Sequence, residues 1–254
     1  MADGICNKGV AECAFNLGQI APARHLPRYV RSLQDRSMNS DSYYAHCRPE
    51  MLAYFPNEPG RVLDVGCGNG RFGAMLKTKL RGAEVWGVEP VADAHAEAAK
   101  VLDRATLGMF CEDIDLPLAS FDTIVFNDSL EHFPDENAPL KLARRLLKPG
   151  GRVIASIPNV RYWPHMREYL FSADWRYRDH GILDSTHLRF FTKRSIQRCF
   201  NDVGFEVQRI AGINPCWRDL RLSVAKAVWP SGMQDMLYLQ FAVVASSKAE
   251  SNPC

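Results

Sequence analysis

The chain has 254 residues, of which 46% are hydrophobic, and its 31 basic and 29 acidic side chains leave a formal net charge of +2. This length and composition suit one large α/β domain that can bury a substantial core. The near balance of charge argues against a nucleic-acid-binding protein, which would carry a basic stripe or a much higher isoelectric point.

The cysteines and the amino-terminal sequence indicate the compartment. None of the 8 cysteines forms a C-x-x-C pair, so we expect neither a zinc knuckle nor a thioredoxin-type redox site. Scattered single cysteines are typical of a reducing compartment. The first residues lack a basic stretch followed by an unbroken apolar run, and no apolar run is long enough to span a membrane. We therefore expect a cytoplasmic protein without membrane insertion.

The first part of the chain differs from the rest. Residues 1–40 mix glycine, proline, asparagine and arginine without clear periodicity, and we expect an N-terminal arm there. Residues 42–55 have the character of a helix that Pro56 and the turn-rich residues after it would end.

From residue 61 onwards, short β-rich runs alternate with helical segments. The expected strands lie at 61–65, 83–88, 105–110, 121–126, 152–157, 204–210 and 237–245. The expected helices lie at 71–80, 92–102, 135–147 and 192–201. Strands that alternate with helices indicate βαβ units, and near-continuous apolar strands indicate burial on both faces. We therefore expect an α/β fold with a doubly wound, mostly parallel sheet of seven strands.

A glycine-rich loop follows the first strand. Residues 62–70 read VLDVGCGNG and enter a helix, where glycines let a ligand approach the backbone closely. Their G-x-G-x-G spacing departs from the G-x-G-x-x-G pattern of pyrophosphate-binding loops. Asp64 stands two residues before Gly66, and its charge would repel a phosphate but tolerate a cationic amino-acid ligand. The loop therefore disfavours a nicotinamide-dependent oxidoreductase.

Acidic residues follow the next two expected strands. Glu89 ends the second strand, where a carboxylate can accept hydrogen bonds from both ribose hydroxyls. Asp113 and Ile114 come after the third strand, and an aspartate there can accept a hydrogen bond from an exocyclic amine such as that of adenine. The glycine loop and these acidic residues follow three successive strands and would lie at one edge of the sheet, and together they indicate a nucleoside ligand.

The segments VLDVGCGNGRFG, VWGVEP, EDIDLPLASFDTIVFNDSLEHF and LLKPGGRVIASIPN resemble the successive motifs of class I S-adenosylmethionine-dependent methyltransferases. This resemblance implies a Rossmann-like domain over residues 41–254, S-adenosylmethionine as the cofactor, and an antiparallel last strand that residues 237–245 could supply. The residues that it implies at the cofactor are Asp64, Gly66, Cys67, Gly68, Gly70, Glu89, Pro90, Asp113, Ile114 and Asn127.

An insert over about residues 159–191 is rich in aromatic residues and arginine. With its THLRFFT stretch it resembles a bacterial subgroup that includes proteins linked to surface-polysaccharide and other sugar pathways and the methyltransferase-like proteins of methionine biosynthesis. Arginines could hold a phosphate or carboxylate while aromatics stack on a ring, so we expect a substrate lid and an anionic substrate such as a nucleotide-linked or phosphorylated glycan. The alternative is a lid whose aromatics only close the core. The expected substrate contacts are Tyr43, Tyr44, Asn159, Arg161, Tyr162 and Trp163.

Three histidines are candidates for a catalytic base. Methyl transfer from a sulfonium is an in-line displacement that depends on positioning, and a hydroxyl acceptor also needs a base to take its proton. Histidine is the natural base near neutral pH, and the candidates are His187, His180 and His132. For His132 the alternative is a packing or gating role. The sequence contains no constellation that indicates a metal.

The leading hypothesis is O-methylation of a small molecule or glycan. An N- or C-methyltransferase on the same scaffold stays open, since an amine acceptor with a free lone pair needs less help from a base. A non-catalytic, methyltransferase-like regulatory protein also stays open. Residues 211–234 could form the surface of a homodimer.

Overall fold

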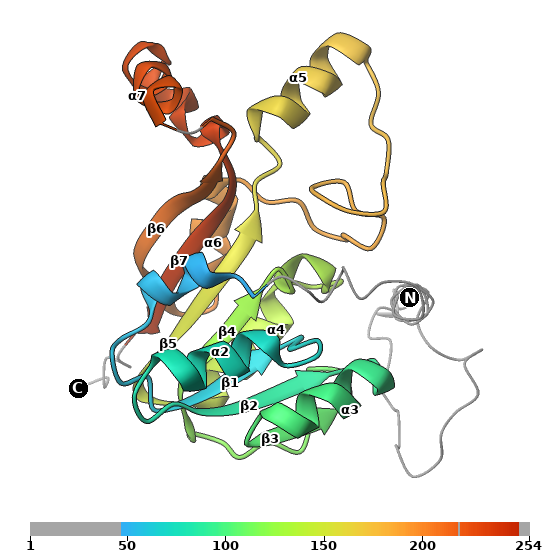
Figure 1. The fold of residues 1–254 in the computed structure, drawn as a ribbon, viewed down its shortest axis with the longest axis vertical. Coiled ribbons are helices and arrows are strands. Elements are labelled where there is room, and N and C mark those ends of the chain that lie inside the picture. Colours follow the sequence, from blue (N-terminus) through green and yellow to red (C-terminus); the bar gives the residue numbers. More distant parts are fainter. Residues whose placement is uncertain (1–46, 218, 249–254) are drawn as a thin grey trace, which may run out of the picture.

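A seven-stranded sheet forms the centre of the computed structural model, which describes residues 47–217 and 219–248 (Figure 1). In chain order its strands are β1 (Arg61–Val65), β2 (Glu84–Glu89), β3 (Arg104–Leu107), β4 (Phe121–Asn127), β5 (Leu147–Pro158), β6 (Phe205–Pro215) and β7 (Tyr238–Ser247). The α-helices are α2 (Arg71–Lys79), α3 (Ala92–Val101), α4 (Asn137–Leu146), α5 (Trp163–Ser172), α6 (Lys193–Asp202) and α7 (Asp219–Val228). Short 3-10 helices are η3 (Pro49–Tyr54), η4 (Leu130–His132) and η5 (Ser231–Leu237).

The strand order is β3-β2-β1-β4-β5-β7-β6. Strands β1 to β5 pair in parallel, whereas β7 runs antiparallel to both β5 and β6. The expectation of a doubly wound, mostly parallel sheet with an antiparallel last strand is therefore confirmed. The order reverses between β1 and β4, and a crevice opens at such a point beyond the carboxyl ends of the strands.

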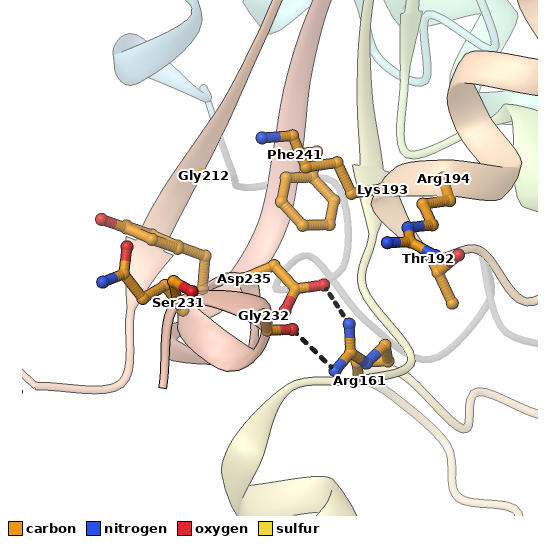
Figure 2. Close-up of a pocket in the computed structure, with 11 residues that line it drawn as sticks. Arg161, Thr192, Lys193, Arg194, Gly212, Ser231, Gly232, Asp235 and Phe241 are labelled. Carbon is orange, nitrogen blue, oxygen red and sulfur yellow. Dashed lines mark hydrogen bonds and ion pairs between the residues drawn. The ribbon is translucent and has the colours of Figure 1, made fainter. Parts of the chain in front are cut away.

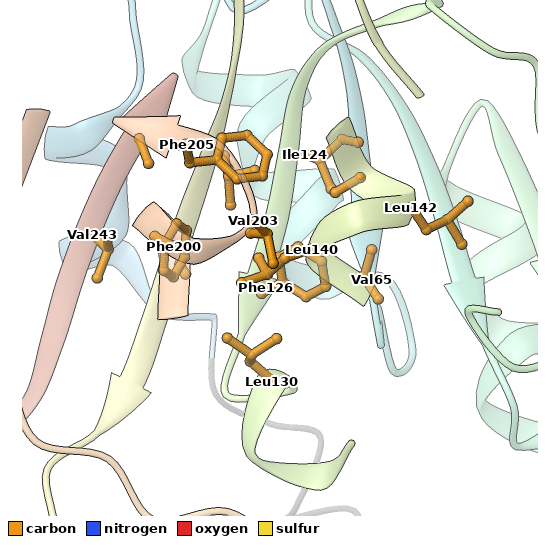
Figure 3. Close-up of a cluster of buried hydrophobic side chains, with 14 of the residues drawn as sticks. Val65, Ile124, Phe126, Leu130, Leu140, Leu142, Phe200, Val203, Phe205 and Val243 are labelled. Atoms are coloured by element: carbon orange, nitrogen blue, oxygen red, sulfur yellow. The ribbon is translucent and has the colours of Figure 1, made fainter. Parts of the chain in front are cut away.

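Helices cover both faces of the sheet. Successive residues of a strand point to opposite faces, so neighbouring strand residues pack in two different clusters. Leu63 and Ile124 belong to the cluster under α4 and α6, which includes Leu140 and Phe200 (Figure 3). Their neighbours Val62 and Val125 pack with Phe72 and Leu76 of α2 in a second cluster. Burial on both faces explains why the strands read as near-continuous apolar runs.

Several elements differ from expectation. The described part of the expected helix 42–55 is the 3-10 helix η3, and its first residues lie outside the described ranges. The third strand ends at Leu107, so that residues 108–120 form a loop. The insert contains α5, and α7 and η5 precede β7; α5 and α7 project at the same end of the sheet (Figure 1). No helix in the described ranges has the length and apolar character that a membrane span requires.

Candidate active site

A cavity of about 1300 Å³ lies at the carboxyl ends of β1, β2 and β4. Its walls come from the glycine loop after β1, the end of β2, the residues after β3 and β4, and a turn of the insert. Among the expected cofactor residues, those that line it are Asp64, Gly66, Cys67, Gly68, Glu89, Pro90 and Asn127. The crevice thus brings together residues from successive strand ends, as the topology requires.

The glycine loop is fastened to the end of β2. The amides of Gly66 and Cys67 both donate to the carbonyl of Val88, over 2.9 and 3.1 Å. The amide of Gly68 donates to Glu89 Oε2 over 2.8 Å. Gly66 and Gly68 have φ angles of 76° and 54°, a left-handed region that glycine adopts without steric cost. The loop therefore presents backbone instead of side chains to the cavity.

Gly70 has another role than the expected ligand contact, because it is not among the residues that line the cavity. A Cβ atom added there would lie 2.8 Å from Val101 Cγ2 and 3.0 Å from the Cα atom of Ala98. Gly70 therefore lets the start of α2 pack closely against α3.

Glu89 and Asp64 form a buried acidic pair, exposed by only 4% and 2%. Burial raises the pKa of Glu89 to about 7, even though the amides of Gly68 and Val91 donate to its two oxygens. Burial and then the charge of Glu89 raise the pKa of Asp64 to about 7. A carboxylate offers about four lone-pair sites, so Glu89 can still accept hydrogen bonds from two hydroxyls. Such an acidic cavity favours a cationic ligand.

Buried polar atoms without partners mark the floor of the cavity beyond β4. Both amide atoms of Asn127 and the hydroxyl of Ser129 are buried and have no hydrogen-bond partner among the described residues. Buried polar atoms are nearly always hydrogen-bonded in native proteins. These atoms therefore indicate the place of a polar ligand.

Asp113 and Ile114, which we expected beside the adenine, are not among the residues that line the cavity. Asp113 is exposed, and Ile114 packs against the core. Instead, Gly108, Met109 and Phe110 line the cavity. Strand β3 ends at Leu107, earlier than expected. The three residues that follow it, and not Asp113 and Ile114, therefore lie at the carboxyl end of the sheet beside the cavity.

The expected substrate contacts in the insert are also outside the cavity. Asn159 is fully buried, and its side-chain amide donates to the carbonyls of Asp235 and Tyr238, each over 2.9 Å. Arg161 forms an ion pair of 2.7 Å with Asp235. Trp163 packs edge-on against Trp229. These side chains hold η5 and α7 to the start of the insert.

The other expected substrate contacts are three tyrosines: Tyr43, Tyr44 and Tyr162. Tyr162 precedes α5 directly and is likewise not among the cavity-lining residues. Tyr43 and Tyr44 lie outside the described residues. The cavity wall on the side of β5 to β7 comes instead from residues that the sequence analysis did not single out. There, Gln240 donates to Asp128 over 2.6 Å and Arg48 pairs with Asp128.

Two of the three candidate histidines meet in the cavity. The ring centroids of His132 and His187 lie 4.9 Å apart. Nδ1 of His132 is 3.1 Å from the carbonyl oxygen of Thr186, and Nδ1 of His187 is 2.9 Å from that of Ile182. A carbonyl only accepts hydrogen bonds, so Nδ1 carries the proton in each ring and Nε2 carries the lone pair when the ring is neutral. His180 is exposed at the edge of the cavity.

Glu131 is the functional candidate that the sequence analysis missed. It is 1% exposed, neither carboxylate oxygen has a hydrogen-bond partner among the described residues, and Oε1 lies 3.8 Å from His187 Nε2. Burial raises its pKa to about 8. The only feature of the sequence that pointed to Glu131 was its position directly before His132. The third member of the group, His187, is distant in the chain.

Glu131, His132 and His187 each offer a ligand atom, and these atoms lie within 4.8 Å of one another. Two imidazole nitrogens and a carboxylate oxygen form a donor set that divalent transition metals accept. The structure therefore assembles a group that could hold a metal ion, which the sequence analysis did not expect.

A turn of the insert holds this group in place. Asp184, which is 2% exposed, accepts hydrogen bonds from the amide and the hydroxyl of Thr186 over 2.8 and 2.7 Å. The amides of Leu188 and Arg189 donate to the carbonyl of Glu131 over 2.9 and 3.0 Å. The turn that carries His187 is thereby fastened to η4, which carries Glu131 and His132.

Comparison with known proteins identifies the family. Residues 37–210 match a family model described as a methyltransferase domain. The chain belongs to this methyltransferase family. With the fold described above, it is an S-adenosylmethionine-dependent methyltransferase.

Similar curated proteins are named ubiquinone biosynthesis O-methyltransferase. The one from Paraburkholderia phymatum is 31% identical over 175 residues, which cover 64% of this methyltransferase and 72% of that protein. The one from Idiomarina loihiensis is 37% identical over 112 residues, which cover 41% of this chain and 45% of that protein. Against this relative and that from Paracidovorax citrulli, the match spans about half of the curated protein.

Solved structures of similar shape include S-adenosylmethionine-dependent methyltransferases from Archaeoglobus fulgidus and Mesorhizobium loti. The first has a TM-score of 0.59 at 18% identity and covers 85% of this chain and 98% of that chain. The second has a TM-score of 0.55 at 18% identity and covers 80% and 98%. At this identity the likeness shows the fold alone.

The cavity fits the cofactor of this family. S-adenosylmethionine carries a sulfonium, an ammonium group and ribose hydroxyls, and the cavity offers a buried acidic pair and the partnerless amide of Asn127. The carboxylates of Asp64 and Glu89 would stabilise the positive charges of the sulfonium and the ammonium group, and the ribose hydroxyls could donate hydrogen bonds to Glu89.

Proposed function

We propose that this methyltransferase transfers a methyl group to a hydroxyl oxygen of a small molecule, with His187 as the base. The observation that carries this proposal is the imidazole pair. Both rings have Nδ1 held by a backbone carbonyl, and His187 Nε2 lies beside the buried carboxylate of Glu131. The pair lies in the same cavity as the acidic residues that suit the cofactor.

The cofactor would be held by the residues at the ends of β1, β2 and β4. Glu89 would accept hydrogen bonds from the ribose hydroxyls, and Gly66 and Gly68 would border the chain of the methionine part. Asp64 and Asn127 would face its charged amino-acid end. Met109 and Phe110 would form the wall beside the adenine, in place of Asp113 and Ile114. When bound, S-adenosylmethionine supplies an electrophilic methyl group.

The residues of the chain would then orient the acceptor and remove its proton. Nε2 of His187 accepts the proton of the hydroxyl as the oxygen attacks the methyl carbon in line. The ring becomes an imidazolium, and its positive charge favours the ionised form of Glu131, whose Oε1 lies 3.8 Å from Nε2 and in that form stabilises the charge. His132, whose ring contacts that of His187, would limit the positions that the base can adopt.

The acceptor that we propose is a ring hydroxyl of a small molecule. The relatives' names support an oxygen acceptor and ubiquinone biosynthesis, and they give no support to the glycan of the sequence analysis. The anionic substrate also loses its expected anchor, because Arg161 is outside the cavity. Arg48, which does line the cavity, is paired with Asp128 and Glu50. A phenolic hydroxyl is acidic enough for an imidazole base to assist its deprotonation.

Cofactor binding can be tested by calorimetric titration with S-adenosylhomocysteine. We expect micromolar binding by the wild-type protein and none by a Gly68→Arg variant, because the long side chain would enter the cavity that the loop leaves open. The thermal unfolding of both proteins serves as the control for folding. Absence of binding by folded wild-type protein would contradict the assignment of the cavity.

The base is tested by a His187→Gln variant in a methyl-transfer assay with ring-hydroxylated acceptors. We expect kcat to fall by about 10²–10⁴-fold, with the affinity for S-adenosylhomocysteine within a few-fold of wild type. A His180→Gln variant is the matched control, since that ring is exposed at the edge of the cavity, and it should keep most of the activity. Equal losses in the two variants would remove His187 from the proposal.

A divalent ion at Glu131, His132 and His187 is the second candidate, favoured by the spacing of their ligand atoms. In that case the ion would activate the hydroxyl, and Nε2 of His187 could not serve as the base. Dialysis against a chelator distinguishes the two. We expect activity to survive it; loss of activity that returns with added metal would establish the metal centre instead.

A further inference from the structure

A second cavity of about 610 Å³ lies between the start of the insert, the start of α6, and η5 (Figure 2). We propose that it binds the phosphate group of a small phosphorylated molecule. The residues on which this proposal rests are Arg161, Lys193, Arg194, Asp235 and Tyr238. The proposal does not depend on the acceptor of the methyl group.

This phosphate cavity is separate from the active site. Gln240 of β7 lines the active-site cavity, and the next residue, Phe241, lines the phosphate cavity. Tyr238 also lines the phosphate cavity, and Leu239 also lines the active-site cavity. The two cavities share no lining residue, so a ligand in the phosphate cavity would contact a different set of side chains.

The charges in the phosphate cavity are unbalanced. Arg161 is neutralised by Asp235 at 2.7 Å and also donates to the carbonyl of Gly232 over 3.4 Å, so its guanidinium group is held in one orientation. Lys193 and Arg194 form no ion pair with any residue in the part of the chain that the structure describes. Two positive charges thus remain without compensation beside one that is fixed. Such a concave basic site concentrates anions.

The position of these cations on α6 strengthens the inference. Lys193 and Arg194 are the first two residues of the helix, and its first turn contains no acidic residue. The amino-terminal end of a helix carries a partial positive charge and favours acidic residues over basic ones. Two cations there are unfavourable for the helix alone, and a bound anion would relieve their repulsion.

The shape of the cavity indicates the class of ligand. Figure 2 shows the side chain of Lys193 beside the ring of Phe241, with Arg194 and Arg161 farther from the ring. Guanidinium groups bind phosphate through paired N–H donors, and the partly exposed ring of Tyr238 offers an apolar wall. A volume of about 610 Å³ exceeds what an inorganic ion needs and is in the range of small-molecule sites. A phosphate ester of a small organic molecule fits both features.

The test is a calorimetric titration of the full chain with inorganic pyrophosphate at constant ionic strength. We expect saturable binding by the wild-type protein, a loss of affinity of at least about tenfold in Arg194→Ala, and partial recovery in Arg194→Lys. The matched control is Arg198→Ala, because Arg198 is an exposed residue of the same helix that does not line the cavity. This control should bind as tightly as wild type.

Binding of S-adenosylhomocysteine, measured in the same proteins, reports on folding and should be unchanged in all of them. Two results would overturn the proposal: no saturable binding by wild-type protein that still binds S-adenosylhomocysteine, or equal losses in Arg194→Ala and Arg198→Ala. The second result would mean that the anion senses only the overall charge of α6.

Discussion

At the scale of single residues, the protonation of the active-site histidines depends on one turn of the insert. Both carbonyls that face an Nδ1 atom, those of Ile182 and Thr186, belong to this turn. The turn is held by the carboxylate of Asp184, which accepts two hydrogen bonds from Thr186. A group with no expected role in the chemistry therefore determines which ring nitrogens are basic.

We predict that Asp184→Ala lowers kcat by about 10–100-fold, because the turn loses its anchor and the rings lose their fixed orientation. The affinity for S-adenosylhomocysteine should stay within a few-fold of wild type. Nitrogen NMR of the imidazole rings should show a mixture of tautomers, which a purely structural role would not produce. Asp184→Asn keeps one carbonyl acceptor and should recover part of the activity. An Asp184→Ala protein with normal kcat and one tautomer would contradict this role.

At the scale of elements, the contact between α2 and α3 depends on glycine. Gly70 precedes α2 with a φ angle of 78°, and an added Cβ atom would meet Val101 and Ala98 of α3. Gly82 also has a positive φ angle, of 65°, but an added Cβ atom there would meet nothing within 4 Å. The two positions therefore separate the cost of backbone conformation from the cost of crowding.

We predict that Gly82→Ala lowers the free energy of unfolding by about 1–2 kcal/mol, the cost of a left-handed conformation. Gly70→Ala should cost about 1–3 kcal/mol more, because the methyl group also overpacks the contact between α2 and α3. Chemical denaturation of both variants measures the difference. Equal losses would mean that α3 moves away without cost.

At the scale of the whole molecule, three buried carboxyl groups couple stability to pH. Burial raises the pKa values of Asp64 and Glu89 to about 7 and that of Glu131 to about 8. The folded protein therefore keeps protons that the unfolded chain loses near pH 4. The stability from these protons is fully present below pH 4 and is lost as the pH rises through 7 and 8.

We predict that the free energy of unfolding of the cofactor-free protein falls between pH 5 and pH 8, by at most about 1.4 kcal/mol per pH unit for each group. Acids with lowered pKa values, such as Asp103 and Asp122, have their effect at lower pH and do not mask this trend. In Glu131→Gln the free energy of unfolding should fall less steeply with pH, by up to about 1.4 kcal/mol per pH unit. Denaturation at a series of pH values measures it, and equal slopes in the two proteins would contradict the burial of Glu131 as a neutral acid.

Much of the fold and about half of the candidate site could be predicted from local features of the sequence. The alternation of apolar strands and helices predicted the sheet, because periodicity reflects which faces a segment buries. The glycine loop and Glu89 were predicted because their spacing follows from the backbone of one strand–loop–helix unit. Asp113 does not line the cavity, because its place depends on where β3 ends, and strand ends are set by pairing with a neighbour.

What the sequence by itself determined is therefore the order of the strands along the chain, the glycine loop and the acidic residues at the ends of β1 and β2. Only the tertiary structure decided that Glu131 and His132 meet His187, more than fifty positions away, and that Arg161 turns from the active site to Asp235. The physical reason is that turn chemistry and periodicity act between neighbours in the chain. The contacts of a long insert depend instead on the path of its backbone across the sheet, which no local pattern encodes.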